Sequence, residues 1–292
     1  MPAILKTVIS RLLGRMRLAL TRLPEDDDSL MKAAGIIPYP YLAQSINRYQ
    51  LAFSTKPQFS LIYQVVSPYT MVPFDVLASL YDQVTYLAQN NIPGVFVECG
   101  VWKGGSMGVV AAAILDSKQP QRTLHLFDSF DDICEPDPTV DGPRALKDVK
   151  SLAGVNPEKL TGKLSPVKGI YQQFGGHGTV ESCRDLLIHK LHYDASKVVF
   201  HPGWFQETLP NQSDQIEEIA LLRLDSDWFE STRICLDYLY SKVVQGGIVV
   251  IDDYGAYEGC RTAVDRFLQS SGIKKYLIPA STTNSECFFF VK

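Results

Sequence analysis

The chain has 292 residues, of which 46% are hydrophobic, 21% charged and 11% aromatic. This length and composition exclude a disordered or fibrous protein and favour one α/β domain of catalytic size with extensions. The formal net charge of −4 provides no general phosphate-neutralising surface, so we expect no nucleic-acid partner. No apolar run is long enough to predict a transmembrane helix.

The six cysteines have neither CxxC nor metal-ligand spacing. This pattern indicates free thiols in a reducing compartment, so a cytoplasmic location is expected.

The first residues form a basic amphipathic segment with no acid before Glu25. Its basic residues are Lys6, Arg11, Arg15, Arg17 and Arg22. Arginines interrupt the apolar positions too often for a secretory signal. We favour a helix that packs on this protein or on a second copy in a homo-oligomer, while a membrane-surface helix and a transit peptide are alternatives. With the acidic linker and an irregular, proline-containing stretch, residues 1–72 are interpreted as an N-terminal extension or cap.

Strands and helices alternate through residues 73–292, which we interpret as the catalytic domain. Periodicity predicts helices at residues 74–90, 106–116, 230–244 and 258–269, and strands at residues 95–99, 123–127, 198–201, 219–224, 247–251, 276–278 and 287–291. Gly246 and Gly247 are expected to end the third helix. The alternation predicts a parallel sheet covered by helices on both faces, with an antiparallel hairpin at one edge.

Residues 134–178 do not fit this alternation and are rich in glycine, proline and lysine. A loop of this size inside a compact domain is usually functional, so we interpret it as a lid.

A glycine-rich loop follows the first predicted strand, at the place where parallel sheets bind ligands. It contains Gly100, Trp102, Gly104, Gly105 and Ser106. The loop has neither the GxGxxG nor the GxxxxGK[ST] spacing of phosphate-binding loops. Glu98, just before it, would repel a pyrophosphate but could pair with an ammonium group. A structural glycine turn with an incidental glutamate is the alternative.

Asp128 ends the next predicted strand, roughly two dozen residues further on, which suits an acid that binds two ribose hydroxyls. A nucleoside ligand is therefore implied, with simple helix capping as the alternative. Trp204 follows another strand and could stack on an adenine or cap the core. His125 alternates within a buried strand and is interpreted as structural.

Two more predicted strands end in carboxylates, at Asp225 and at the pair Asp252 and Asp253. If the strands are neighbours, these acids converge and repel one another unless a divalent cation compensates them. Oxygen ligands favour Mg²⁺, with Mn²⁺ or Ca²⁺ possible, and such a metal could activate a substrate hydroxyl. Helix capping is again the alternative.

These motifs together resemble the macrocin O-methyltransferase family of S-adenosylmethionine-dependent enzymes. The matching segments are GVFVECGVWKGGS at 94–106, LFDSF at 126–130, ETLP at 207–210, IALLRLDSDWFEST at 219–232 and GGIVVIDDYG at 246–255. The likeness runs from about residue 74 to residue 267. The first 70 residues and residues 134–178 depart from the family pattern.

The resemblance implies a Rossmann-like class I methyltransferase sheet of seven strands in the order 3-2-1-4-5-7-6, an S-adenosylmethionine donor, Mg²⁺ and a sugar hydroxyl as acceptor. Glu98 and the glycine-rich loop would hold the methionine end of the donor. Asp128 would hold the ribose, with Ser129, Phe130 and Trp204 near the adenine. The predicted metal ligands are Asp225, Asp252 and Asp253, and Asp225 is also the predicted base.

Other functions remain open at this point. A phenolic or catechol hydroxyl could replace the glycoside as acceptor. An NAD-dependent sugar-modifying oxidoreductase shares the sheet and the ribose acid, but it would normally carry a GxGxxG loop and a catalytic Tyr/Lys pair or His.

Overall fold

The structure, a computed structural model, describes residues 57–281 and 283–292. The chain divides into two compact units, and the second, from Lys56 to Lys292, contains every element discussed below. The basic N-terminal segment and its acidic linker lie outside the described residues. Their expected role in packing, oligomer formation or membrane contact stays a prediction. No helix in the described part of the chain combines the length and apolarity needed to cross a membrane.

A seven-stranded sheet organises this unit, with strand order β3-β2-β1-β4-β5-β7-β6 among the described residues. The strands are β1 (Val95–Cys99), β2 (Leu124–Asp128), β3 (Val198–Pro202), β4 (Ile219–Leu224), β5 (Val243–Ile251), β6 (Ile278–Pro279) and β7 (Phe288–Val291). The first five are parallel, whereas β7 pairs antiparallel with both β5 and β6. The predicted class I methyltransferase fold, with its antiparallel edge hairpin, is therefore confirmed.

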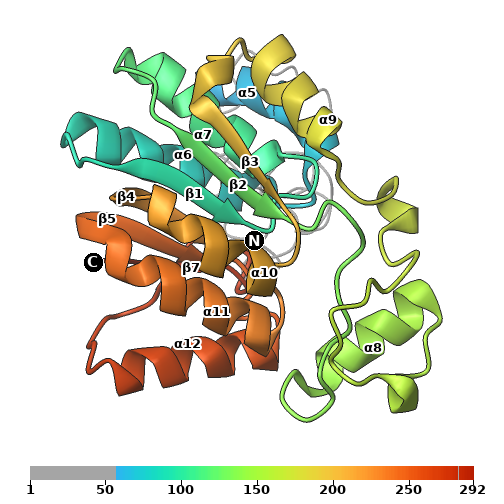
Figure 1. The fold of residues 1–292 in the computed structure, drawn as a ribbon. Coiled ribbons are helices and arrows are strands. Elements are labelled where there is room, and N and C mark those ends of the chain that lie inside the picture. The colour runs from blue at the N-terminus through green and yellow to red at the C-terminus, as the bar shows by residue number, and fades with distance from the viewer. Residues whose placement is uncertain (1–56, 282) are drawn as a thin grey trace, which may run out of the picture. The chain divides into compact units, whose positions relative to one another are not determined.

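Helices cover both faces of the sheet, as Figure 1 shows. One layer contains α5 (Pro57–Val66), α6 (Phe74–Gln89), α7 (Gly105–Ser117) and α9 (Val180–Arg184), and the other contains α10 (Phe205–Gln212), α11 (Phe229–Leu239) and α12 (Glu258–Ser270). Buried apolar residues of β1, β4 and β5 pack against α11 and α12 in one continuous core. The apolar periodicity of the sequence thus predicted four of these helices, α6, α7, α11 and α12.

Two local expectations are wrong. Residues 57–66 are not irregular but form α5, whose Phe59 packs edge-to-face on Phe74 of α6 at a centroid distance of 4.9 Å. Gly246 and Gly247 do not end a helix either, because α11 stops at Leu239 and both glycines lie inside β5. A Cβ on Gly247 would lie 2.8 Å from Val243 Cγ1, so the strand itself requires a small residue there.

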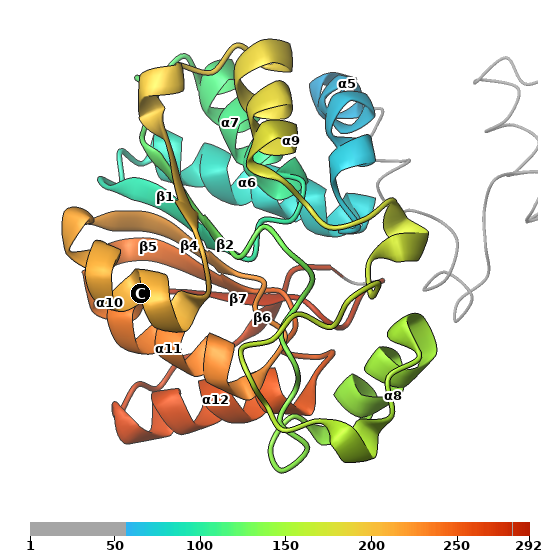
Figure 2. The same ribbon diagram turned by 45° about the vertical axis from the view of Figure 1, so that its right-hand side comes forward.

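The segment between β2 and β3 leaves the sheet and carries a separate helix, α8 (Gly142–Ala153). Figure 2 shows α8 outside the two helical layers, beside the carboxyl ends of the strands. A bridge between Cys134 and Pro166 closes the base of this insertion, and Val149, Leu160 and Val167 form a small core within it. The predicted lid, residues 134–178, falls within this segment, and its bounds and its role as a lid stay a prediction.

Candidate active site

The carboxyl ends of β1, β2, β4 and β5 meet at one edge of the sheet, where β1 separates β2 from β4. This is the place where open α/β sheets bind ligands. Gly100 follows β1 with φ +90°, and a Cβ there would lie 1.6 Å from the Asp225 backbone oxygen. Only glycine allows the β1 loop and the end of β4 to approach this closely.

Asp128 organises the loops after β1 and β2. Its Oδ2 accepts hydrogen bonds from the backbone N–H groups of Val101 (2.6 Å) and Trp102 (2.9 Å), and its Oδ1 accepts one from Phe130 N (2.6 Å). Burial raises the pKa of Asp128, whereas these backbone bonds act in the opposite direction. The carboxylate therefore fixes the loop conformation, and Asp128 also lines the larger cavity at this edge.

Three non-glycine residues in these loops have left-handed backbone conformations: Trp102 (φ 49°), Phe130 (φ 52°) and Asp227 (φ 53°). Such conformations are costly for side chains and concentrate at ligand sites, where surrounding contacts maintain them. The strain marks the loops after β1, β2 and β4 as the functional edge.

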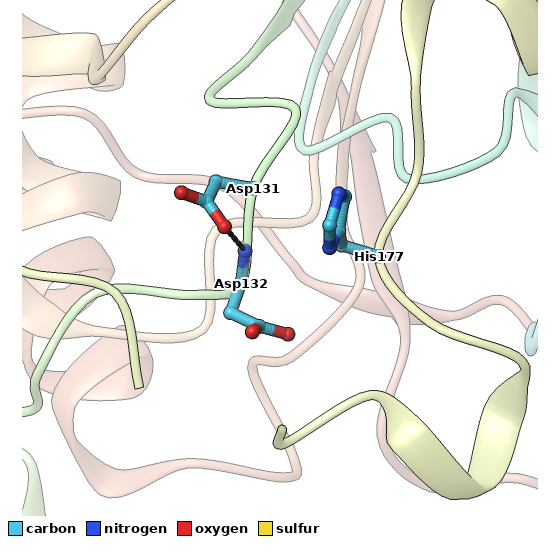
Figure 3. A group of neighbouring side chains, drawn as sticks. All are labelled: Asp131, Asp132 and His177. Atoms are coloured by element: carbon cyan, nitrogen blue, oxygen red, sulfur yellow. Dashed lines mark hydrogen bonds between the residues drawn. The ribbon is translucent and has the colours of Figure 1, made fainter. Parts of the chain in front are cut away.

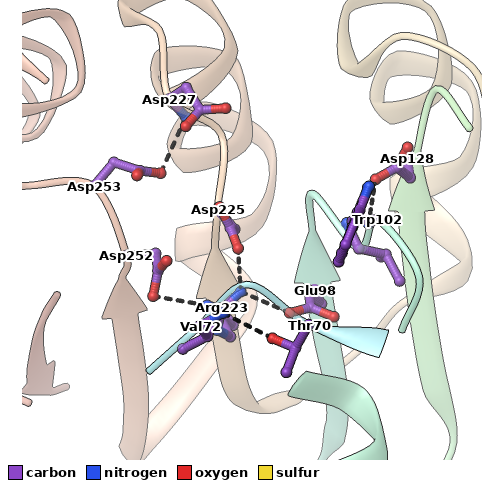
Figure 4. A network of polar contacts seen from close by, with 11 residues as sticks. Thr70, Val72, Glu98, Trp102, Asp128, Arg223, Asp225, Asp227, Asp252 and Asp253 are labelled. Carbon is purple, nitrogen blue, oxygen red and sulfur yellow. Dashed lines mark hydrogen bonds and ion pairs between the residues drawn. The ribbon is translucent and has the colours of Figure 1, made fainter. Parts of the chain in front are cut away.

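Arg223 is the buried centre of the carboxylate cluster, with 1% of its side chain exposed. Its Nη1 lies 2.7 Å from Glu98 Oε1 and 2.8 Å from Asp225 Oδ2, and its Nη2 lies 2.7 Å from Asp252 Oδ1. Figure 4 shows the guanidinium between the ends of β1, β4 and β5. The sequence argument treated these acids as unpaired, so it missed the compensating charge that β4 itself supplies.

Glu98 lines neither of the two adjoining cavities at this edge of the sheet. Burial is the main cause that raises its pKa, to about 8, and Arg223 opposes this shift. Its Oε2 is buried and has no hydrogen-bond partner in the part of the chain that the structure describes. One oxygen therefore holds the cluster together, while the other is a buried acceptor to which no described residue donates a hydrogen bond.

Asp225, Asp227 and Asp253 form a second group in which one oxygen of each carboxylate lies within 4.8 Å of the others. Asp253 Oδ2 also accepts a hydrogen bond from Asp227 N (3.3 Å). Burial and the neighbouring acid Asp252 raise the pKa of Asp225 to about 6, against the effect of Arg223. Burial and neighbouring carboxylates raise the pKa values of Asp227 and Asp253 well above the usual range.

The structure therefore assembles a different acidic triad from the predicted one. Asp227, which the sequence argument did not select, stands with Asp225 and Asp253, whereas Asp252 is directed to Arg223 (Figure 4). Asp252 and Asp253 are consecutive residues after β5, and their side chains point in different directions, so only Asp253 lies in the triad. The metal-binding roles of these residues stay predictions.

A further group, Asp131, Asp132 and His177, lies beside the site (Figure 3). Lys168 Nζ is 2.5 Å from Asp131 Oδ1, and Gly169 N donates to Asp132 Oδ2 at 2.9 Å. The lysine already compensates this group and would repel a cation.

Two adjoining cavities open at this edge. The larger, of about 270 Å³, is lined by five of the ten predicted donor-binding residues, and the smaller is about 200 Å³. The larger cavity is lined, among others, by Gly100, Trp102, Asp128, Ser129 and Trp204. Five residues line both cavities: Met71, Trp102, Asp225, Asp227 and Tyr257. The acidic triad thus lies where the two cavities meet.

The remaining predicted donor residues lie elsewhere. Gly105 and Ser106 line the smaller cavity, and Tyr69 and Thr70 pack directly on Gly105. Gly104 contacts Cys183, and neither it nor Phe130 lines either cavity. These residues therefore shape the loop around the larger cavity, and their direct contact with a donor stays a prediction.

The sequence pattern of the macrocin O-methyltransferase (TylF) family matches residues 64–174 and 183–291. The chain belongs to this family. It is 33% identical over 215 residues, 72% of its length and 71% of the relative's, to demethyldecarbamoylnovobiocin O-methyltransferase of Streptomyces niveus. It is 27% identical to mycinamicin III 3''-O-methyltransferase of Micromonospora griseorubida, covering 72% of this chain and 74% of that one.

Among solved structures, the O-methyltransferase NovP superimposes with a TM-score of 0.59 at 29% identity, covering 77% of this chain and 82% of NovP. Membership of the macrocin O-methyltransferase family makes the protein an S-adenosylmethionine-dependent O-methyltransferase. The alternative of an NAD-dependent oxidoreductase is thereby rejected.

Proposed function

We propose that this enzyme methylates a sugar hydroxyl of a glycosylated natural product with the assistance of Mg²⁺. The observation that carries the proposal is the position of the Asp225, Asp227 and Asp253 triad between the two cavities. The names of two relatives give demethyldecarbamoylnovobiocin and mycinamicin III as their acceptors, which supports a natural-product acceptor here.

The larger cavity has the chemistry that S-adenosylmethionine requires. Asp128 offers carboxylate lone pairs to ribose hydroxyls, and Trp204 offers an indole ring to the adenine. Glu98 lies behind this cavity, and its buried Oε2, which has no hydrogen-bond partner among the described residues, is the acceptor proposed for the ammonium of the methionine end. The donor supplies a methyl group on a sulfonium, whose sulfur leaves as a neutral thioether.

The triad fits a hard divalent cation. Carboxylate oxygens from three residues can bind Mg²⁺ together with water and substrate oxygens, and Arg223 neutralises the acids behind them. The metal would supply a positive charge that lowers the pKa of the acceptor hydroxyl. Among the described residues, neither Asp227 nor Asp253 has a basic side chain within ion-pair distance.

Asp225 is the proposed base. Arg223 holds its Oδ2, so Oδ1 is the oxygen that would both contact the cation and take the acceptor proton at the junction of the two cavities. The raised pKa of this carboxyl, about 6, makes it a stronger proton acceptor than an ordinary aspartate. Asp252 is proposed to hold Arg223 in place, instead of binding the metal directly.

The proposal is tested by methyl transfer to a panel of aryl glycosides after EDTA treatment and dialysis. Activity should be lost and restored by Mg²⁺, while calorimetric donor affinity stays within about twofold, because the metal contacts the acceptor. Asp227→Asn should weaken Mg²⁺ binding by roughly tenfold or more, about the value of one charge-assisted contact. Asp237→Asn, on the exposed face of α11, is the matched control. Full activity without metal would contradict Mg²⁺ assistance.

A further inference from the structure

Tyr171 belongs to the insertion but lines the larger cavity, together with Asp128, Asp225 and Asp227. Its ring centroid lies 6.4 Å from that of Trp102, in the glycine-rich loop. A residue from outside the sheet thus forms part of the wall that faces the acidic triad.

Backbone contacts fix the position of Tyr171. Its carbonyl oxygen accepts hydrogen bonds from Phe174 N and Gly176 N, both at 2.9 Å, which closes a tight turn. Trp102 Nε1 donates to Gly176 O at 3.1 Å, and Lys103 Nζ donates to Phe174 O at 3.0 Å. The glycine-rich loop therefore clamps the turn that carries the tyrosine.

The phenol hydroxyl has no hydrogen bond to any residue in the described part of the chain. Tyr257, which lines the same cavity, differs because its hydroxyl donates to Asp148 Oδ2 at 3.1 Å. Burial and the charges of Asp227, Asp128 and Asp225 raise the pKa of Tyr171 well above its usual value. Tyr171 is therefore a neutral hydrogen-bond donor without an acceptor among the described residues, in a site otherwise rich in acceptors.

We propose that the Tyr171 hydroxyl binds a second oxygen of the acceptor sugar, next to the hydroxyl that is methylated. This assignment rests on the proposed function and narrows it to acceptors with two neighbouring oxygens. In this arrangement the hydroxyl to be methylated lies at the acidic triad, and Tyr171 of the insertion donates a hydrogen bond to the adjacent sugar oxygen. Tyr171 is accordingly a specificity-determining residue delivered by a segment outside the sheet.

The test compares Tyr171→Phe with the wild-type enzyme on aryl 6-deoxyhexosides and on analogues that lack one hydroxyl each. Loss of one hydrogen bond should raise the acceptor KM by about five- to tenfold, with donor affinity unchanged. With the analogue that lacks the recognised oxygen, the two enzymes should differ by less than twofold, as expected for a double-mutant cycle. Tyr276→Phe, at a position that is 94% exposed, is the matched control.

Three outcomes overturn the assignment. An unchanged acceptor KM shows that the hydroxyl binds nothing, a matching loss of donor affinity places it in the donor site, and an equal effect on every analogue indicates a purely structural role. If the wild-type enzyme binds the donor but methylates no member of the panel, this outcome contradicts the proposed function and not only the role of Tyr171. The two failures are therefore distinguishable.

Discussion

The strand-end cluster and the insertion contribute to the same cavity but are held in place in different ways. Arg223, Glu98 and Asp252 are fixed by three neighbouring strands, and their charges are buried. The insertion is attached through a single bridge, a small core and a few side-chain clamps such as Lys103. The Arg223 cluster is thus held by the sheet itself. We expect substitutions in the insertion, which forms part of the cavity wall, to reduce the free energy of unfolding less than substitutions in this cluster.

The largest expected effect comes from breaking the centre. Arg223→Met leaves the buried Glu98 and the partly buried Asp225 and Asp252 without their cation and should lower the free energy of unfolding by about 3–5 kcal/mol. Arg233→Met also removes an arginine with two acidic partners, Glu230 and Asp237, but that side chain is 41% exposed. It should cost less than about 1 kcal/mol. Urea titration of both variants measures the difference. Equal losses in the free energy of unfolding would show that burial does not increase the contribution of the Arg223 ion pairs to stability.

Two buried histidines in neighbouring strands make the stability of the sheet depend on pH. His125 Nδ1 and His201 Nε2 are 3.0 Å apart, and His201 Nδ1 contacts Gln212. Burial, with the neighbouring His201, lowers the pKa of His125 to about 4. Because the unfolded state then binds more protons, stability is present above pH 6.5 and is lost as the pH falls towards 4.

The loss attributable to His125 should be about 2–3 kcal/mol over this interval. His125→Gln should flatten the profile of unfolding free energy against pH, relative to wild type, between pH 6.5 and pH 4. His189→Gln, at an exposed position, should leave the profile unchanged. A His125 variant with the wild-type slope would assign acid lability to the carboxylates instead.

The smallest expected effect on stability is at the clamp of the insertion. Lys103→Met removes the hydrogen bonds to Phe174 O and Gly175 O, both solvent-accessible, and should cost less than about 1 kcal/mol. Limited proteolysis within residues 171–178 should nevertheless accelerate several-fold, because local opening no longer breaks these bonds. Lys118→Met, in a helix C-cap away from the insertion, serves as control. If unfolding and local cleavage changed together, the insertion would be an integral part of the rigid core.

Much of the fold follows from patterns that need no long-range information. Alternation of apolar strands with amphipathic helices predicted the sheet, and acids at strand ends predicted where Asp128, Asp225 and Asp253 would gather. The errors have a local cause: Gly246 and Gly247 resemble a helix stop in sequence, yet both lie in β5, where Gly246 has φ +81° and a Cβ on Gly247 would lie 3.1 Å from the Ala220 backbone oxygen. The helix α5 has no long apolar repeat of its own, and its packing on α6 and α7 stabilises it.

The sequence alone determined the fold class, the family and the edge of the sheet that carries the site, because strand periodicity and loop motifs are local properties. Only the tertiary structure decided which acids form ion pairs with the same arginine. Arg223 is hidden in the sequence as one residue of an apolar strand, but the sheet brings it between Glu98, Asp225 and Asp252. The tertiary structure also places Asp227 beside Asp225 and Asp253, and Tyr171 in the wall of the larger cavity. Contacts between distant segments depend on strand register and packing, which no local pattern encodes.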